Sequence, residues 1–315
     1  MILYYTRENG QLKQVDQRTD RAWINISPPF IKEELNKLSI DLSIPLDFLT
    51  DSLDVDERSR YEREDDVRLI VLNSPVPNES NKDNEAIYIT VPIGIIITID
   101  HVITITAAEN PVLQQFLESK VRNFKPEDEQ LFVLQIFEKN VLEYLACLKK
   151  LNLKRHIIEQ ELYDSSKSSE LKQLLRIEKS LVYMLSSLSS NELLKMKMKR
   201  TDFLKIKEDE FKMDLFEDII IDNSQALEMA NIHTNILSGT MEAYASIISN
   251  NLNIFIQRLT LITIVLMVPT LVASFYGMNV PVPMENSPYA FPMIVFISIV
   301  VSLFLVWFFL RKKLF

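Results

Sequence analysis

Two uncharged apolar stretches constrain the fold of this chain more than any other feature. Leu259 to Met284 carries no charged side chain over 26 positions, and Ala290 to Leu310 carries none over 21. As a helix, each stretch is long enough to cross the roughly 30 Å hydrocarbon core of a bilayer. We therefore expect a large N-terminal part followed by a two-helix transmembrane hairpin.

The charges around this hairpin predict its orientation. Arg258 precedes the first span and Arg311, Lys312 and Lys313 follow the second, whereas residues 277–289 between the spans contain no Lys or Arg. Because basic residues stay on the cytoplasmic side, we expect a multi-pass protein of the cell membrane with both termini in the cytoplasm.

The distribution of proline predicts an α/β domain followed by long helices. Eight of the 13 prolines lie at or before Pro126, and the 142 residues from Glu127 to Val268 contain none. Before this segment, short β-branched runs alternate with helical stretches. We expect strands at 2–5, 22–26, 67–72, 87–91, 93–99 and 102–106. We expect helices near 29–38, 45–53, 111–122, 127–163 and 170–188, with breaks at the serine-rich segments 164–169 and 186–190.

The fold class is therefore an α/β cytoplasmic domain, then long helices, then the hairpin, with a stalk helix that runs into the first span. The expected parts are an N-terminal α/β domain (1–125), a helical region (126–207), the stalk with the first span at about 255–276 (208–276), an outer loop (277–289), the second span (290–310) and a basic tail (311–315). A helix over 208–276 would be about 100 Å long and would need neighbours to pack against.

Composition excludes several classes of function. The four glycines are too far apart for a phosphate-binding loop, and one cysteine with three scattered histidines gives no zinc spacing. A net charge of −9 argues against nucleic acid as a partner. We expect neither an enzyme nor an organic cofactor.

Polar residues recur along one face of the first span. Thr260, Thr263, Thr270 and Ser274 are spaced at 3.5-residue steps when Met267 is included, and the series continues downward to Glu242 through Ile256, Asn253, Ser249 and Ser246. Small hydroxyl residues in membrane helices often mark helix packing. The same stripe would line a pore if several parallel copies surrounded an axis, and a 3.5-residue period favours such a bundle.

The preceding segment is acidic throughout. Residues 213–257 contain six acids and no Lys or Arg: Asp214, Glu217, Asp218, Asp222, Glu228 and Glu242. Such a run is commonly a solvated helix face. Around a symmetric axis it would become a negative funnel that concentrates cations.

The segment after the first span carries a family resemblance. Tyr276-Gly277-Met278-Asn279 follows the span directly, in a chain with two C-terminal spans and a basic tail. This pattern resembles the CorA family of divalent-cation channels. The resemblance implies a homopentamer in membrane lipid that takes up Mg²⁺, with Co²⁺ and Ni²⁺ also accepted.

The resemblance also implies roles for individual residues. Gly277, Met278 and Asn279 would form the selectivity filter, where oxygen atoms hold the hydrated ion through its waters. Asn253 would form a polar ring, Leu259 and Met267 apolar constrictions, Ile256 a further apolar ring, Thr270 a pore-facing hydroxyl and Glu242 an acidic ring. Thr260, Thr263 and Ser274 belong to the polar stripe described above and would line the same pore. Arg311, Lys312 and Lys313 would form a basic collar.

Regulation by intracellular Mg²⁺ is a further implication of the resemblance. Asp218, with Asp222, matches the stalk side of the regulatory site, and we expect a partner acid from the α/β domain within Glu79 to Glu85. The outer loop departs from the sequence of better-known members, although Glu285 keeps the offset of their acid from Asn279. Two alternatives stay open: a zinc-transporting relative, disfavoured because the pore stretch has no Cys or His, and a membrane-anchored scaffold or sensor that conducts no ions.

Overall fold

The computed structural model describes residues 1–8, 11–19, 21–79, 85–164, 168–279, 281, 283 and 287–311. The chain divides into two compact units, Met1–Gly239 and Thr240–Phe315. Helix α6 (Glu210–Tyr276) contributes its first part to one unit and the rest to the other. The predicted fold class, an α/β domain with long helices and a C-terminal apolar hairpin, is confirmed. The finer six-part division stays a prediction.

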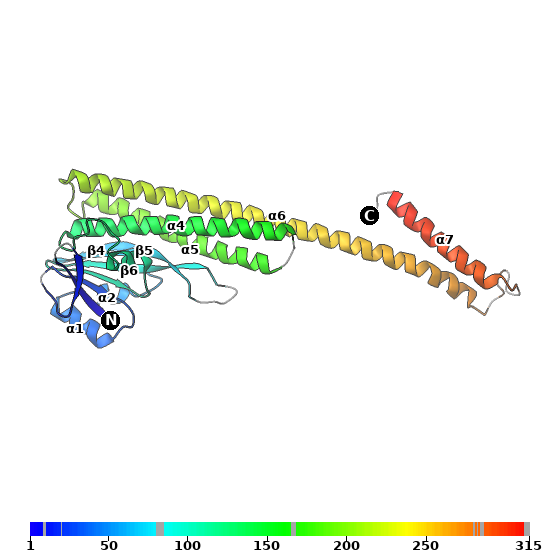
Figure 1. Ribbon diagram of the computed structural model, residues 1–315, viewed down its shortest axis with the longest axis horizontal. Coiled ribbons are helices and arrows are strands. Elements are labelled where there is room, and N and C mark those ends of the chain that lie inside the picture. Colours follow the sequence, from blue (N-terminus) through cyan, green and yellow to red (C-terminus); the bar gives the residue numbers. More distant parts are fainter. Residues whose placement is uncertain are drawn as a thin grey trace. The chain divides into compact units, whose positions relative to one another are not determined.

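A seven-stranded sheet forms the base of the first unit (Figure 1). Its order is β2-β1-β3-β7-β6-β5-β4, with β3 and β7 parallel and all other neighbours antiparallel. The strands are β1 (Ile2–Glu8), β2 (Gln11–Val15), β3 (Trp23–Ile26), β4 (Arg60–Glu64), β5 (Val67–Pro77), β6 (Tyr88–Ile97) and β7 (Val102–Thr106). The two runs predicted on either side of Pro92 form the single strand β6. Pro92 lies beyond the end of β7, whose pairing begins at Ile93, so its missing N–H interrupts no pairing on that side.

Helices cover both faces of this sheet. Helices α1 (Lys32–Asp41) and α2 (Leu46–Asp51) lie below it in Figure 1, whereas α4 (Glu129–Asp164) and α5 (Ser168–Thr201) lie above it. The core under α1 and α2 includes Leu35 and Phe48, packed on Leu69 and Ile103. Burial on both faces explains why β5, β6 and β7 are apolar almost throughout.

An aromatic cluster closes one end of the sheet. Trp23 packs against Phe116, Phe124 and Phe132, with ring centroids 5.3 to 6.3 Å away. Phe116 belongs to the short helix α3 (Pro111–Leu117), which begins where the Asn110 side chain accepts a hydrogen bond from the backbone N–H two residues on. This cluster fixes the start of α4 against the sheet.

A buried polar node fastens α4 and α5 to β5. The backbone carbonyl of Asn73 accepts hydrogen bonds from Asn140 Nδ2 (3.0 Å), Tyr144 Oη (3.1 Å) and Asn191 Nδ2 (2.8 Å). Three donors on one carbonyl hold two helices at one register on the strand. Burial strongly raises the pKa of the Tyr144 phenol, which therefore stays a donor.

Helix α5 continues through the segment where the sequence predicts a break. Residues 186–190 are helical, and Ser187 among them bonds to the sheet instead of to a local turn. Ser187 donates to Thr90 Oγ1 at 2.8 Å, and two turns earlier Ser180 accepts from the backbone N–H of Ile87 at 2.8 Å. The predicted break is therefore wrong.

Candidate ion pathway

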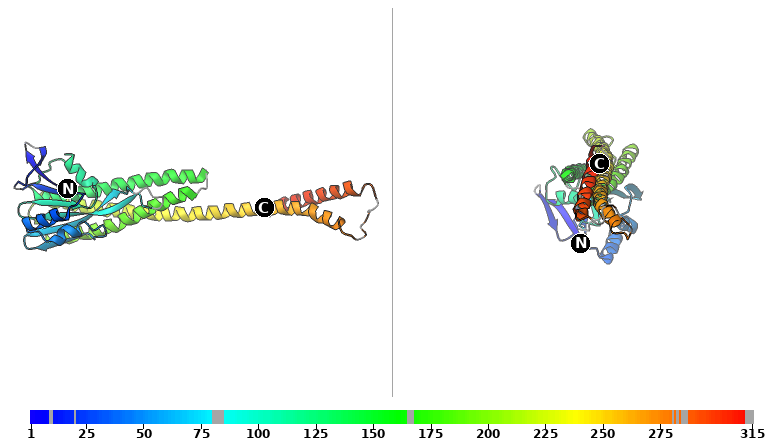
Figure 2. Two further views of the ribbon diagram at one scale, coloured as in Figure 1. Left: turned by 90° about the horizontal axis from the view of Figure 1, so that it is seen from below. Right: turned by 90° about the vertical axis from the view of Figure 1, so that its right-hand side faces the viewer.

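The second unit pairs the end of α6 with α7 (Ala290–Arg311), both long and apolar enough to cross a membrane. Figure 2 shows the two helices as a hairpin. On α7, Ser298 and Ser302 are buried at 5% and 8% exposure. Small residues at these positions let two helix backbones approach each other. The α6 residues that are partly covered share one side of that helix: Leu261, Ile264, Val265, Val268, Val272 and Tyr276.

One contact between α6 and α7 supplies a hydrogen bond that α6 itself lacks. Pro269 has no N–H, so it cannot donate to the carbonyl of Val265 four residues earlier. Ser302 Oγ of α7 donates to that same carbonyl at 3.4 Å. A carbonyl in hydrocarbon that lacked a donor would cost several kcal/mol, so the serine stabilises both α6 at Pro269 and the helix pair.

The eight predicted pore-lining residues lie away from this contact. Each is exposed in the single chain: Asn253, Ile256, Leu259, Thr260, Thr263, Met267, Thr270 and Ser274. In the span they lie on the side of α6 opposite its partly covered residues, because the two sets differ by about half a helical turn. The face predicted to line a pore is thus left uncovered by α7.

The threonine hydroxyls on this face are oriented by the helix itself. Thr260, Thr263 and Thr270 donate to the carbonyls four residues earlier at 2.8, 2.9 and 3.1 Å. With the proton used inside the helix, each oxygen keeps lone pairs that face outward. Such acceptors suit the waters of a hydrated cation, which donate hydrogen bonds.

The same spacing continues along α6 well below Glu242. Steps of three and four residues from Ser274 lead back through Glu242, Gly239 and Asn235 to Asp214, and we call the whole set the exposed series. Its members between Asp214 and Gly239 are all exposed: Asp214, Asp218, Ile221, Gln225, Glu228, Ile232, Asn235 and Gly239. Four of the six acids of the stalk therefore belong to this series. The sequence alone could have indicated this extension, because the 3.5-residue spacing is visible in it as far back as Asp214.

A second stripe on α6 faces the first unit. Phe216, Ile219, Asn223, Ala226, Ala230 and Leu237 are buried with the same 3.5-residue spacing, two residues out of step with the exposed series. Two residues correspond to about 200° around a helix. The stalk therefore packs through one side and leaves the opposite side free.

The predicted regulatory residues differ in their positions. Asp218 is exposed and belongs to the exposed series, whereas Asp222 is half-buried and lies one residue away from it. Neighbouring Glu217 forms an ion pair with Lys199 at 2.6 Å. Among the described residues, no three His, Cys, Asp or Glu side chains gather closely enough to hold a metal ion. Of the predicted partner segment, residues 80–84 lie outside the described residues.

The predicted filter follows the end of α6. Gly277 N donates to the carbonyl of Ala273 at 2.9 Å, which completes the last turn, and Gly277, Met278 and Asn279 are all exposed. The Arg311 guanidinium lies 5.1 Å from the centre of the Trp307 ring. The other predicted site residues, Glu285, Lys312 and Lys313, lie outside the described part of the chain.

Sequence patterns do not indicate one buried lysine, which lies in α5 and contacts the stalk helix. Lys195 of α5 is completely buried, and its Nζ donates to Asn223 Oδ1 of α6 at 2.7 Å and lies 5.7 Å from the centre of the Phe137 ring of α4. Burial lowers the pKa of Lys195 to about 7, and the negative charge of Glu192 partly opposes this effect. The residue joins three helices at the packed stripe.

Comparison with known proteins finds several similar proteins. A family model described as CorA-like Mg²⁺ transporter protein matches residues 20–312. The cobalt/magnesium transport protein CorA of Methanocaldococcus jannaschii is 26% identical over 295 residues, which cover 92% of this chain and 90% of that protein. The complete structure of the CorA magnesium transporter from the same organism has a TM-score of 0.79 at 24% identity and covers 99% of this chain and 98% of that one. The cytoplasmic domain of ZntB from Vibrio parahaemolyticus shares the fold more distantly, with a TM-score of 0.59 at 10% identity over 80% of this chain and 97% of that one.

Proposed function

The chain belongs to the CorA-like Mg²⁺ transporter family, and from this premise we propose that it forms a homopentameric channel in the cell membrane. The channel carries Mg²⁺ into the cell, accepts Co²⁺ and Ni²⁺, and has both termini in the cytoplasm. Mg²⁺ is at once the transported ion and the regulatory ligand.

The exposed series on α6 is the observation that supports this proposal. It joins acids, exposed isoleucines and outward-facing hydroxyl oxygens along one side of one helix. Ile221 and Ile232 are 63% and 47% exposed in the single chain. Large apolar side chains interleaved with acids suit an interface between copies of the stalk that cations help to neutralise.

At the filter, Asn279 and the carbonyl of Gly277 would hold the ion. Mg²⁺ prefers oxygen ligands in octahedral geometry and gives up its waters reluctantly, so a ring of amide oxygens can bind the hydrated ion through those waters. Selection would then depend on charge and on hydrated size.

A matched pair of variants tests the pore. Met267 belongs to the exposed series and Leu266 does not, although the two are 63% and 65% exposed. Replacing either by glycine costs about 1 kcal/mol of helix propensity. In liposomes, Met267→Gly should increase Mg²⁺ leak because a constriction is lost, and Leu266→Gly should not. Equal leak from both variants would refute the assignment of this face to the pore.

The filter and the transported ion are tested together. Asn279→Ala should abolish ion flux into liposomes, measured in turn with Mg²⁺, Co²⁺, Ni²⁺ and Zn²⁺, while the protein still inserts in the membrane. Unchanged Mg²⁺ flux in this variant contradicts the filter role. Flux of Zn²⁺ with none of Mg²⁺ would favour the zinc-transporting alternative.

Asp218 is our candidate for the stalk side of the regulatory site. Asp218→Lys should weaken Mg²⁺-dependent closure, because it places a positive charge where the cation would bind. The measurement is the Mg²⁺ concentration that protects the full-length protein from protease. Glu33→Lys of α1, an exposed acid that undergoes the same change of charge, is the control. Protection that is identical in all three proteins removes Asp218 from the site.

The non-conducting alternative predicts a different result for substitutions of the threonines on the exposed face of α6. In a scaffold or sensor, the double change Thr263→Leu and Thr270→Leu would leave cation uptake as it is in the parent protein. In the proposed channel, this change removes two rings of outward-facing oxygens and should reduce uptake strongly. The flux assay distinguishes the two.

A further inference from the structure

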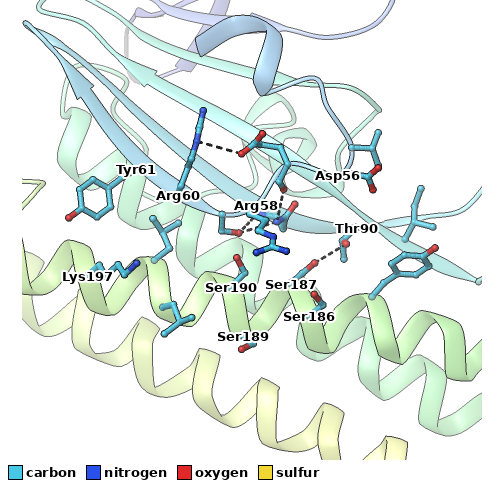
Figure 3. A pocket seen from close by; sticks show the side chains of 18 residues that line it. Asp56, Arg58, Arg60, Tyr61, Thr90, Ser186, Ser187, Ser189, Ser190 and Lys197 are labelled. Carbon is cyan, nitrogen blue, oxygen red and sulfur yellow. Dashed lines mark hydrogen bonds and ion pairs between the residues drawn. The ribbon is translucent and has the colours of Figure 1, made fainter. Parts of the chain in front are cut away.

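A cavity of about 950 Å³ lies in the first unit between α5 and the sheet, remote in sequence from the predicted ion pathway (Figure 3). Its walls are the segment that leads into β4, the start of β4, parts of β5 and β6, and the α5 face from Tyr183 to Lys197. Its volume falls within the range of pockets that bind small organic molecules. Nothing in the proposed ion pathway uses it.

Hydrogen bonds make the floor of this cavity rigid. Ser59 Oγ donates to Asn191 Oδ1 at 2.6 Å, and Asn73 Nδ2 donates to Ser59 Oγ at 3.0 Å. At the other end, Ser187 Oγ donates to Thr90 Oγ1 at 2.8 Å. This part of the lining is therefore organised before any ligand binds, which reduces the entropy lost on binding.

Two cations in the lining have no counter-ion among the residues that the structure describes. Arg60 is occupied by Asp51 at 2.9 Å and by Glu57 at 3.5 Å. In contrast, neither Arg58 nor Lys197 makes a side-chain ion pair or hydrogen bond with any described residue. Figure 3 shows Arg58 reaching toward the serines of α5, on which Lys197 also lies. Two unpaired positive charges thus face one cavity in a chain whose net charge is −9.

Hydroxyl donors line the same cavity as these cations. Ser186, Ser190 and Lys197 follow one another at helical spacing along the cavity side of α5, and Ser189 adds a third serine. The three hydroxyls are without a hydrogen-bond partner among the described residues. A guanidinium, an ammonium and free hydroxyls are the donors that proteins use for phosphate oxygens. The acid Asp56 lies toward the Thr90 end of the cavity, away from Lys197 (Figure 3).

Exposed apolar side chains complete the cavity. Val55, Tyr183 and Leu193 line it and are 49%, 49% and 57% exposed. Inorganic phosphate would leave this surface in contact with water. A ligand with a flat or apolar body would cover it.

We propose that this cavity binds a small phosphorylated molecule of the nucleoside monophosphate class. Arg58, Lys197 and Ser190 hold the phosphate, and Tyr183 and Leu193 contact the organic body. The charge of a phosphate monoester at neutral pH, about −1.5 to −2, matches the two unpaired cations. The site would be separate from the Mg²⁺ sites of the stalk.

Calorimetric titration of the full-length protein in detergent tests the proposal, with AMP, inorganic phosphate and adenosine as probes at fixed Mg²⁺. We expect saturable AMP binding, weaker phosphate binding and no adenosine binding. Arg58→Gln and Lys197→Gln should each weaken AMP binding about tenfold or more, because each removes a charged hydrogen bond. Tyr183→Ala should weaken AMP binding without changing phosphate binding.

Lys172→Gln is the matched control, since Lys172 is an exposed lysine of the same helix outside the cavity lining. Equal weakening by this control would show a general charge effect and overturn the site. The absence of saturable AMP and phosphate binding, or AMP affinity unchanged in Arg58→Gln and Lys197→Gln, would also overturn it. Phosphate that binds as tightly as AMP would refute the assignment of an organic body.

Discussion

The buried lysine of α5 gives the protein a pH dependence that can be calculated from its surroundings. Lys195 is 0% exposed, and its hydrogen bond to Asn223 and its contact with the Phe137 ring do not replace the water it has lost. Its pKa falls from the ordinary 10.5 to about 7. The folded protein therefore releases this proton at a lower pH than the unfolded chain does.

The sign and size of the effect follow from proton linkage. Between about pH 7 and 10.5 the unfolded chain binds one more proton at this site than the folded protein, so stability rises with pH. The difference between the two pKa values corresponds to about 5 kcal/mol of destabilisation at low pH, where the buried amine is charged. Between pH 7 and pH 9, about 2 kcal/mol of that destabilisation should be relieved.

Lys195→Met tests this reasoning, because methionine fills similar space without a charge. The apparent Tm of the full-length protein in detergent should rise between pH 7 and pH 9 by several degrees more in the parent than in the variant. Lys199→Met, four residues along at an exposed position paired with Glu217, is the control and should keep the slope of the parent. If the only effect of Lys195→Met were the loss of its hydrogen bond to Asn223, the Tm would change by the same amount at every pH, and the slope of Tm against pH would stay that of the parent. Parallel profiles for the parent and Lys195→Met would refute the calculation.

Two further predictions concern close contacts. A methyl group at Gly94 would lie 2.1 Å from Oγ of Ser52, the residue that follows α2. Gly94→Ala should therefore destabilise the protein by about 1–3 kcal/mol and lower its thermal midpoint. An unchanged midpoint would show that α2 can shift freely. Ser302→Ala should lower the thermal midpoint because it removes the donor to the Val265 carbonyl. Ser298→Ala should have a smaller effect, because the Ser298 hydroxyl bonds within its own helix. Equal effects would rule out the special role of Ser302.

The strands that sequence patterns identify are those with buried faces. The runs at β1, β3, β5, β6 and β7 are rich in β-branched residues, and each becomes a strand. The missed strands, β2 with Gln11–Val15 and β4 with Arg60–Glu64, are the two edges of the sheet. Charged side chains suit an edge because they discourage pairing with other chains, and the same charges hide the strand from a hydropathy pattern.

The serine-rich part of α5 shows where local propensity fails. Serine favours turns when its side chain bonds the nearby backbone. Here Ser187 bonds Thr90 of β6, a residue 97 positions away, and Asn191 bonds Asn73 of β5. Such partners exist only after the sheet has formed, so neither the continuity of α5 nor the Asn73 node could be predicted from local sequence.

The candidate pathway was more predictable than its surroundings because it depends on the period of one helix. Spacing alone places Thr260 and Met267 on one face, whatever the neighbours of that helix are. The role of Lys195 and the charge balance at Arg58 depend instead on which side chains from other elements lie nearby. Those contacts have no signature along the chain.

The two stripes of α6 explain how one helix can serve both as core and as a surface for assembly. Ile219 and Ala226 are buried on the packed stripe, while Asp218 and Gln225, each one residue earlier, are exposed. Both stripes keep a 3.5-residue period, which in a straight helix would drift by about 20° every seven residues. A left-handed supercoil removes that drift and keeps each stripe on its own side. Because backbone hydrogen bonds hold the turns of a helix together, any rotation of α6 against α4 and α5 turns the exposed series by the same angle. The packing that Lys195 and Asn223 contribute is therefore in a position to set which side chains of the stalk would face a neighbouring copy in the proposed homopentamer.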